Sequence, residues 1–314
     1  MALPLVIVNP TSASGATGEA WPAIASDLRR HFGAFACVFT EAGGDAELIA
    51  EREAKAGRRL IIACGGDGTI SETANGILRS GAQSELGILP SGTGGDFRRT
   101  LGISTRASEA ARALRTGKSR LMDVGRATYL NQAGVSETRY FLNVASFGMG
   151  GAVVERVKEN RTPWLPSNVA RLLGGRVAFA AAALQTTLTF SKPTVELQID
   201  DRAAFRLAVT NFCVVNARYF GGGMKIAPEA KIDDGLFDIV AIGDLSPFTI
   251  LTNSYRIYLG THLGMQKVRH TRARRLDARP TRDDQPVMLE IDGELAGHLP
   301  ATFEIMPAAL RIKV

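Results

Sequence analysis

The sequence contains few of the residues that build covalent or metal-bound frameworks. Its 314 residues include only three cysteines and four histidines. Cys37, Cys64 and Cys213 are odd in number, lie far apart and show no C-x-x-C spacing, which argues against a disulfide framework or a zinc cage. The histidines show no H-E-x-x-H or other ligand spacing, so we expect structural or surface roles for them. This composition fits a protein of the reducing cytoplasm.

Long hydrophobic runs are also missing. Apolar runs such as Val177 to Leu184 fall far short of the roughly 20 residues that span a bilayer, and no basic region precedes the apolar run Leu3 to Val8. We therefore expect no membrane anchor and no export signal. With 45% hydrophobic and 22% charged residues, the chain is nevertheless large enough for two hydrophobic cores.

The first third of the chain alternates short apolar runs with helix-like stretches. This alternation predicts a parallel, doubly wound α/β sheet, in which ligands bind at the carboxyl ends of the strands. The predicted strands are Leu3 to Val8, Phe35 to Thr40, Leu60 to Cys64 and Leu86 to Leu89. The predicted helices are Trp21 to Phe32, Ala46 to Ala56, Thr69 to Arg79 and Ala107 to Thr116.

The remainder of the chain is richer in strand-like segments. We expect a mainly antiparallel β-sandwich there, with domains at residues 1–120 and 121–314. The prediction leaves open that the C-terminal end of the sequence packs back on the first domain. The predicted strands are Leu121 to Leu130, Tyr140 to Val144, Thr194 to Ile199, Phe205 to Val215, Leu236 to Ile242, Val287 to Ile291 and Ala301 to Val314.

Three motifs that combine glycine with an acidic residue carry the chemistry. They are Gly65-Gly66-Asp67-Gly68-Thr69, the stretch Pro90 to Phe97, and Asp292-Gly293-Glu294. Glycines let backbone N–H groups approach phosphate oxygens, and the carboxylates can hold Mg²⁺. Taken singly, the first motif is equally typical of a tight turn with a capping Asp, and Asp-Gly is typical of a hairpin turn. Together they indicate nucleotide phosphoryl transfer.

With these motifs the chain resembles the diacylglycerol kinase catalytic family, which includes bacterial soluble lipid kinases and the sphingosine and ceramide kinases. NAD kinases and phosphofructokinases share the first loop and are expected relatives of the first domain, but they lack the later motifs. Besides the three motifs, the resemblance rests on Asn9-Pro10, Ser14-Gly15, Glu72, Asn75-Gly76, Asp123-Val124-Gly125, Phe141-Leu142-Asn143, Phe147-Gly148, Tyr219 to Met224, Ala227-Pro228 and Asp233 to Asp238.

The resemblance implies ATP as co-substrate and Mg²⁺ as cofactor. The positions that match the family's ATP site are Asn9, Gly65, Gly66, Asp67, Gly68, Thr69, Glu72, Gly92 and Thr93. Those that match the surroundings of the catalytic Mg²⁺ are Asp67, Asp96 and Asp123. Lys231, Asp234 and Leu236 match a second, structural Mg²⁺ site of the bacterial members, and Asp292 matches the proposed general base, with Glu294 beside it.

Two departures from the family pattern bear on the substrate and the nucleotide. Gly95 stands where the family usually has Asn, which removes an amide that could orient the second loop. Sphingosine kinases carry an acidic residue near the end of the stretch that matches Phe147 to Val153, and this chain has Ala152 and no acid nearby. The resemblance therefore disfavours an amino-lipid and favours a neutral glycerolipid such as diacylglycerol.

The predicted function is an ATP-dependent lipid kinase that converts diacylglycerol to phosphatidic acid by direct in-line transfer at an interdomain cleft. At the Asp292-Gly293-Glu294 turn, one carboxylate would accept the lipid hydroxyl proton while the other orients its surroundings. Two alternatives stay open. One is an NAD kinase-like small-molecule kinase, and the other is a nucleotide-binding regulator without turnover, for which Gly95 is the only hint.

The basic balance of the chain suggests a partner surface. The net charge is +6 with a pI near 9.4, and the stretch from Lys267 to Arg282 contains seven Lys or Arg residues against Asp277 alone. We predict peripheral contact with an anionic membrane at its inner face, and the competing interpretation is an exposed strand with solvated arginines. Nucleic acid is disfavoured because no aromatics are interleaved in this stretch, and a homodimer is left open.

Overall fold

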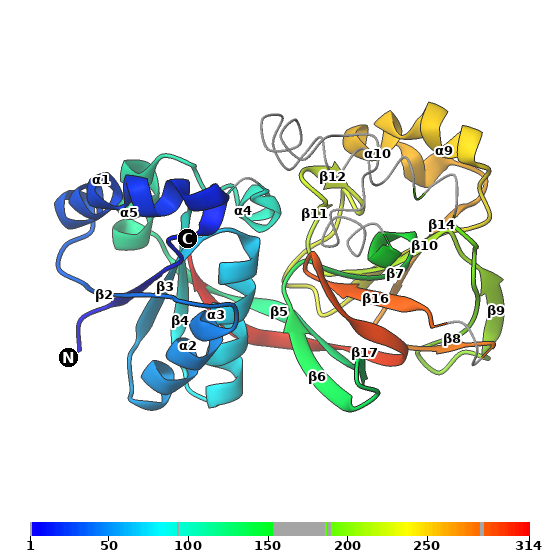
Figure 1. The fold of residues 1–314 in the computed structure, drawn as a ribbon, viewed down its shortest axis with the longest axis horizontal. Helices are drawn as coiled ribbons and strands as arrows, with labels where there is room; N and C mark the ends of the chain where they lie inside the picture. The colour runs from blue at the N-terminus through cyan, green and yellow to red at the C-terminus, as the bar shows by residue number, and fades with distance from the viewer. Residues whose placement is uncertain (1, 93, 153–185, 187–189, 283–285) are drawn as a thin grey trace. The chain divides into compact units, whose positions relative to one another are not determined.

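The computed structural model describes residues 2–92, 94–152, 186, 190–282 and 286–314 and divides the chain into two compact units (Figure 1). The first unit comprises Met1–Val124, Ile232–Gly235 and Met306–Val314. The second comprises Gly125–Lys231 and Leu236–Ile305. Residues 232–235 therefore belong to the first unit, although they lie far beyond the predicted boundary near residue 120.

A parallel sheet forms the centre of the first unit. Strand β1 (Leu5–Val8) pairs with β2 (Ala36–Phe39) and β3 (Leu60–Gly65), and β3 pairs with β4 (Glu85–Pro90). The end of β17 (Glu294–Lys313) adds a further parallel strand, because Arg311 lies opposite Glu85. The apolar runs at β1, β3 and β4 become largely buried strands, as expected for a parallel sheet covered on both faces, whereas the edge strand β2 is partly exposed.

Helices cover both faces of this sheet. Figure 1 shows α1 (Ala16–His31) and α5 (Ala107–Thr116) on one face, with α2 (Asp45–Lys55) and α3 (Asp67–Ser80) on the other. Leu28 of α1 and Leu114 of α5 pack with Val6 and Ile62 of the sheet. Two short elements, η1 (Ser12–Gly15) and α4 (Asp96–Leu101), complete the unit. The doubly wound α/β prediction is confirmed.

The second unit is mainly antiparallel. Along the main path of the sheet, the neighbouring strands are β14, β13, β10, β7, β16 and β17, in that order. Two branches leave this path at β17: one runs through β15 and β8 to β9, and the other through β5 to β6. Strands β11 and β12 form a separate two-stranded sheet. Its complete strands are β6 (Ser136–Phe141), β7 (Val144–Gly148), β8 (Thr194–Ile199), β9 (Phe205–Ala208), β10 (Asn211–Val215), β11 (Tyr219–Phe220), β12 (Met224–Lys225), β13 (Phe237–Ile242), β14 (Val268–Ala273), β15 (Arg275–Pro280) and β16 (Met288–Ile291). It also contains the part of β5 (Ser119–Asn131) from Gly125 onwards and most of β17. The predicted β-rich domain is confirmed.

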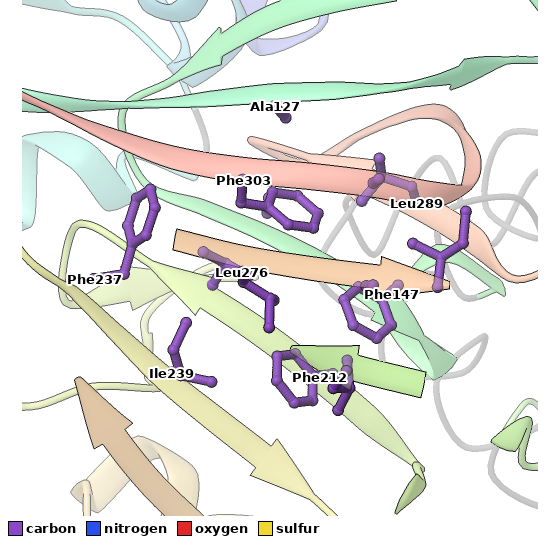
Figure 2. Close-up of a cluster of buried hydrophobic side chains, with 14 of the residues drawn as sticks. Ala127, Phe147, Phe212, Phe237, Ile239, Leu276, Leu289 and Phe303 are labelled. Atoms are coloured by element: carbon purple, nitrogen blue, oxygen red, sulfur yellow. The ribbon is translucent and has the colours of Figure 1, made fainter. Parts of the chain in front are cut away.

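An aromatic core holds the second unit together. The rings of Phe147 and Phe212 stack with centroids 4.8 Å apart, and Phe147 also stacks on Phe303 at 6.3 Å. Figure 2 shows these side chains converging from β7, β10 and β17, with Leu276 and Leu289 beside them. Offset aromatic pairs of this kind add stability beyond their buried area. The core therefore fixes β16 and β17, the two strands on either side of the turn at Asp292.

Short helices follow β13. They are α9 (Pro247–Asn253), α10 (Tyr255–Leu259) and η2 (His262–Gly264). Among the residues that the structure describes, no helix is long and apolar enough to cross a membrane. The apolar run Val177 to Leu184 lies outside the described residues.

The structure differs from the predicted strands in several places. The single strand predicted from Tyr140 to Val144 is divided into β6 and β7, because the backbone N–H groups of residues 142–144 turn towards a carboxylate instead of a neighbouring strand. The strand predicted from Phe205 to Val215 is interrupted at residues 209–210. The basic stretch after Lys267 is not among the predicted strands of the second domain, although its competing interpretation is an exposed strand, and it forms β14 and β15.

Candidate active site

The two glycine loops of the first unit follow neighbouring strands and touch through their backbones. The N–H of Ser91 donates to the carbonyl of Gly65 at 2.9 Å. A Cβ added to Gly92 would lie 2.6 Å from the Cα of Gly66, so a side chain there would collide with main chain. Only glycine allows this approach, and the absence of side chains leaves the loop N–H groups accessible to an anion.

The first loop leads directly into helix α3. Gly66 is the N-cap and α3 begins at Asp67, so the first turn presents N–H groups that have no partner within the helix, together with the positive end of the helix dipole. The buried Thr69 hydroxyl accepts a hydrogen bond from the Asn9 side-chain amide at 3.1 Å. The structure therefore brings Asn9, the loop at 65–69 and Gly92 together, whereas Thr93 lies outside the described residues.

Glu72 makes its described contact away from the loop. Its carboxylate accepts a hydrogen bond from the N–H of Gly44 at 3.0 Å, at the start of α2. Glu72 thus connects α3 to the first turn of α2. A contact between Glu72 and ATP stays a prediction.

Asp67 and Asp96 lie side by side at the start of α4. The Asp67 carboxylate accepts hydrogen bonds from the N–H groups of Asp96 at 3.0 Å and Phe97 at 3.2 Å. Asp96 in turn forms an ion pair with Arg99 at 2.7 Å. Gly95 has a φ of 64°, in the left-handed region that favours glycine and tolerates Asn. Gly95 therefore adopts a backbone conformation that the family's Asn could also adopt, and the substitution removes only the side-chain amide.

Asp123 holds the backbone of two distant segments. It is buried, and its two carboxylate oxygens accept hydrogen bonds from the N–H groups of Gly235 at 2.6 Å and Ala308 at 2.8 Å. Within the described residues, no three His, Cys, Asp or Glu side chains gather in a way that could hold a metal ion. A Mg²⁺ site shared by Asp67, Asp96 and Asp123 therefore stays a prediction, and the contacts described for Asp123 are to two other segments of its unit.

The second predicted metal site lies in a loop that Asp123 anchors. Residues 231–236 form a bend before β13, with Asp234 partly exposed and Gly235 bound to Asp123. A site of one carboxylate and backbone carbonyls, as predicted for Lys231, Asp234 and Leu236, needs no cluster of acidic side chains. It stays a prediction, and the anchoring by Asp123 gives the loop a defined backbone.

In the second unit, Asp292 occupies the turn between β16 and β17. Asp292 and Gly293 both have positive φ, at 49° and 87°, as in the two-residue turns that favour Asp-Gly. The Asp292 carboxylate accepts hydrogen bonds from the N–H groups of Leu142 at 2.9 Å, Asn143 at 2.9 Å and Val144 at 3.2 Å. The hairpin turn and the positioned carboxylate are therefore features of the same residue.

The surroundings of Asp292 raise its pKa. Burial, which disfavours the charged form, is the main cause, and the three backbone hydrogen bonds and the nearby Arg139 act in the opposite direction. A general base works best when its pKa lies near the operating pH. The direction of the pKa shift at Asp292 is therefore the one that a base needs.

Glu294 lies in a different environment. Its partly exposed carboxylate forms an ion pair with Arg139 of β6 at 2.7 Å. Arg139 also lies near the charge of Asp292. Burial acts to lower the pKa of Arg139, but the negative charges of Glu294 and Asp292 outweigh it and raise that pKa. The turn therefore carries one buried, backbone-bound carboxylate and one ion-paired carboxylate, an arrangement that assigns them different roles.

Glu290 supports the turn and was not predicted. Its buried carboxylate accepts hydrogen bonds from the hydroxyl of Ser146 and from the N–H of Gly293, both at 2.6 Å. It thereby connects β7 to the residue that follows Asp292. The signal in the sequence was an acidic residue within the otherwise apolar run Val287 to Ile291, because a buried charge of this kind requires partners.

Known proteins resemble the chain over almost its whole length. Residues 4–127 match the family described as the diacylglycerol kinase catalytic domain, and residues 145–314 match the YegS C-terminal NAD kinase beta sandwich-like domain. A diacylglycerol kinase of Staphylococcus haemolyticus is 30% identical, over 95% of this chain and 84% of that protein. A diacylglycerol kinase of Bacillus subtilis is 29% identical, over 84% of this chain and 80% of that protein. A solved structure of a candidate diacylglycerol kinase from Bacillus anthracis superposes with a TM-score of 0.76 at 25% identity, over 99% of this chain and 94% of that one.

Proposed function

Because the chain belongs to the diacylglycerol kinase catalytic family and is an ATP-dependent lipid kinase, we propose that its acceptor is diacylglycerol and its product phosphatidic acid. The relatives that carry the name diacylglycerol kinase support this substrate. The partly exposed Ala152 also supports it, since no acid stands there to meet the amine of an amino-lipid. Val153 lies outside the described residues. The observation that carries the proposal is the Asp292 carboxylate, fixed by three backbone N–H groups.

In the proposed reaction the first unit binds the nucleotide and the second supplies the base. N–H groups of the loops around Gly66 and Gly92 bind the phosphate oxygens of ATP, with Thr69 and Asn9 fixing the first loop. Asp292 accepts the proton of the lipid hydroxyl as the oxygen forms a bond to the γ-phosphorus. The bond between this phosphorus and the β,γ-bridging oxygen breaks, and ADP leaves. Glu294 and Arg139 orient the surroundings of the base.

The acidic residues of the first unit fit a Mg²⁺ ion that arrives with ATP. Nucleotide-bound Mg²⁺ is usually held by one or two carboxylates, the phosphates and water, without a cage of side chains. We assign this role to Asp67 and Asp96, which lie next to both loops. Asp123 would act by holding the backbone of residues 235 and 308. The ion would neutralise charge on the phosphate oxygens.

The substrate is tested by a radiolabelled ATP assay over a panel of acceptors. Diacylglycerol, sphingosine and ceramide are presented in mixed micelles, and NAD is added in solution as a further acceptor. We expect phosphatidic acid to form fastest, with sphingosine and NAD at background. Faster phosphorylation of NAD would make the chain an NAD kinase, and no turnover with any acceptor would indicate a nucleotide-binding regulator.

The loop at 231–236 is tested through the stability of the protein. If Mg²⁺ binds Asp234 and neighbouring carbonyls, binding stabilises the folded state, so Asp234→Ala should lower the melting temperature in Mg²⁺ and abolish its dependence on the ion. The adjacent, exposed Asp233→Ala is the matched control and should behave as the wild type. A wild-type melting temperature that does not change on adding Mg²⁺ would show that no ion binds this loop.

We propose that the enzyme works in the cytoplasm at the inner face of the membrane, in peripheral contact with anionic lipid. Two of the arginines predicted to make this contact, Arg272 and Arg275, are in ion pairs. Arg272 pairs with Asp238 at 3.3 Å, and Arg275 pairs with Asp277 at 2.9 Å and with Glu304 at 3.2 Å. These pairs reduce the charge that β14 and β15 present to a bilayer. A homodimer stays a prediction.

A further inference from the structure

The exposed apolar side chains of the second unit are concentrated on α9 and α10. Eleven large hydrophobic side chains are exposed among the described residues, and five of them fall between residues 248 and 259. Phe248 and Leu259 are 76% and 63% exposed. We call this group the α9–α10 patch, and its members are Phe248, Leu251, Tyr255, Tyr258 and Leu259.

The patch faces outwards because the opposite side of the helices is already packed. Ile257 of α10 packs against the buried cluster that contains Ile226 and Val268, and α10 also contacts β12 and η2. The positions of the patch follow helical spacing, since 248, 251, 255, 258 and 259 return to one face every three or four residues. Soluble proteins rarely expose such a concentration of apolar side chains without a binding role.

The polar side chains between the patch residues are bonded to their own helix. The Thr252 hydroxyl donates to the carbonyl of Phe248 at 2.8 Å, and the Asn253 amide donates to the carbonyl of Thr249 at 2.9 Å. The Ser254 hydroxyl donates to the carbonyl of Leu251 at 3.0 Å. Because these groups already donate hydrogen bonds within the helix, moving them out of water costs little free energy. The surface can therefore enter an apolar environment without leaving these donors unbonded.

The positive charge of residues 245–276 indicates that the partner surface is anionic. Residues 245–276 contain no Asp or Glu, while they include the basic residues Arg256, Lys267, Arg269, Arg272, Arg274 and Arg275. Arg256 lies within α10, and Lys267 follows η2, which contacts α10. An apolar face with tyrosines and flanking cations is typical of helices that lie in the interface of an anionic bilayer, where Tyr places its ring in the apolar layer and its hydroxyl near the headgroups.

We propose that the α9–α10 patch is the surface through which this kinase docks on the anionic bilayer that holds its substrate. The proposal rests on the proposed lipid kinase function for the identity of that bilayer. Phe248 and Leu259 enter the acyl boundary, Tyr255 and Tyr258 lie at the headgroup level, and Arg256 meets anionic headgroups. The ion-paired arginines of β14 and β15 contribute less than the patch.

The test is sedimentation with vesicles of phosphatidylcholine that contain phosphatidylglycerol, with no ATP present. The double variant Phe248→Ser/Leu259→Ser should lower the partition coefficient of the protein between water and vesicles at least about tenfold. The reason is that two large apolar side chains are no longer present to be transferred from water into the bilayer. Arg256→Gln should weaken binding several-fold at low salt and little at high salt. The matched control Leu48→Ser/Val135→Ser removes two equally exposed apolar side chains elsewhere and should bind as the wild type.

A second readout separates docking from catalysis. With a short-chain diacylglycerol below its aggregation threshold, the Phe248→Ser/Leu259→Ser variant should keep the wild-type kcat/KM, because no docking is needed. Absence of lipid kinase activity in the wild type would overturn the proposed function and leave the vesicle result to stand by itself. The docking proposal is overturned if the double variant binds vesicles as the wild type does, or if it changes a dimer to a monomer in sedimentation velocity while vesicle binding is kept.

Discussion

Replacing Asp292 by Asn should lower kcat for lipid phosphorylation at least about 10²-fold, because an amide cannot accept the proton of the attacking hydroxyl. The affinity for ATP should stay close to the wild-type value, since a base acts in the transition state and the nucleotide loops are in the other unit. The measurements are steady-state kinetics with diacylglycerol and titration calorimetry with ATP. A melting curve establishes that the variant is folded, which matters because Asp292 binds three backbone N–H groups.

The matched control is Asp201→Asn, the same substitution at an exposed turn, which should leave kcat unchanged. The pH dependence gives a second check. In the wild type kcat/KM should fall about tenfold per pH unit below the pKa of the base. Burial raises the pKa of Asp292, so this fall should begin at a higher pH than an ordinary aspartate would give. Near wild-type turnover by Asp292→Asn would remove Asp292 as the base and leave it with its role in the turn.

A methyl group at Gly92 should impair ATP use about as strongly. In Gly92→Ala the Cβ would lie 2.6 Å from the Cα of Gly66 and 3.2 Å from its nitrogen, so the two loops must separate. A displacement of about 1 Å in a positioned phosphate site can cost roughly 10²-fold in rate, and we expect a loss of that size in kcat/KM for ATP. Because Gly92 is exposed, the melting temperature should change little.

Gly43→Ala is the control for this second variant. Gly43 is an exposed glycine of the same unit, and no atom lies within 4 Å of an added Cβ there. Its kcat/KM for ATP should equal the wild-type value. If Gly92→Ala bound and used ATP normally, the contact between the loops would have no part in holding the nucleotide.

The strands of the first unit could be predicted from the sequence because a parallel sheet covered on both faces requires continuous apolar runs. Leu60 to Cys64 and Leu86 to Leu89 lie within β3 and β4. The position of both glycine loops followed from this, since each begins where a run ends. The pattern of apolar residues along the sequence was sufficient to predict the strands wherever burial alone determined the structure.

Contacts between distant residues account for what the sequence did not predict. The break between β6 and β7 depends on Asp292, a residue far along the chain, and no local feature of Leu142 or Asn143 indicates it. Asp123 has a predicted metal role, and its hydrogen bonds to the N–H groups of residues 235 and 308 are a further role that the sequence did not indicate. Glu290 and Arg139 stand next to motifs but belong to none of them. Their roles follow from neighbours that only the fold brings close.

The Asp292-Gly293 turn shows why a motif can support two interpretations. From the sequence alone, a hairpin turn and a catalytic carboxylate are alternative interpretations of this motif. In the structure they are compatible, because the turn directs the Asp292 side chain towards the backbone of residues 142–144. Positive φ at Asp292 is uncommon for a residue other than glycine. The glycine that follows and the Glu290 carboxylate bound to its N–H help to keep the turn in this conformation.

The division of the first unit among separate chain segments has a consequence for biosynthesis. Strand β4 acquires its second parallel neighbour only when Arg311–Lys313 arrive, and the hydrogen bonds that Asp123 accepts from Gly235 and Ala308 form only with these later segments. During translation the nucleotide-binding unit therefore waits with one edge of its sheet uncovered, and without the contacts of Asp123 to residues 235 and 308, while most of the second unit is synthesised. Nascent chains arrested before residue 305 should remain sensitive to protease in the first unit, even though its helices and glycine loops have already left the ribosome.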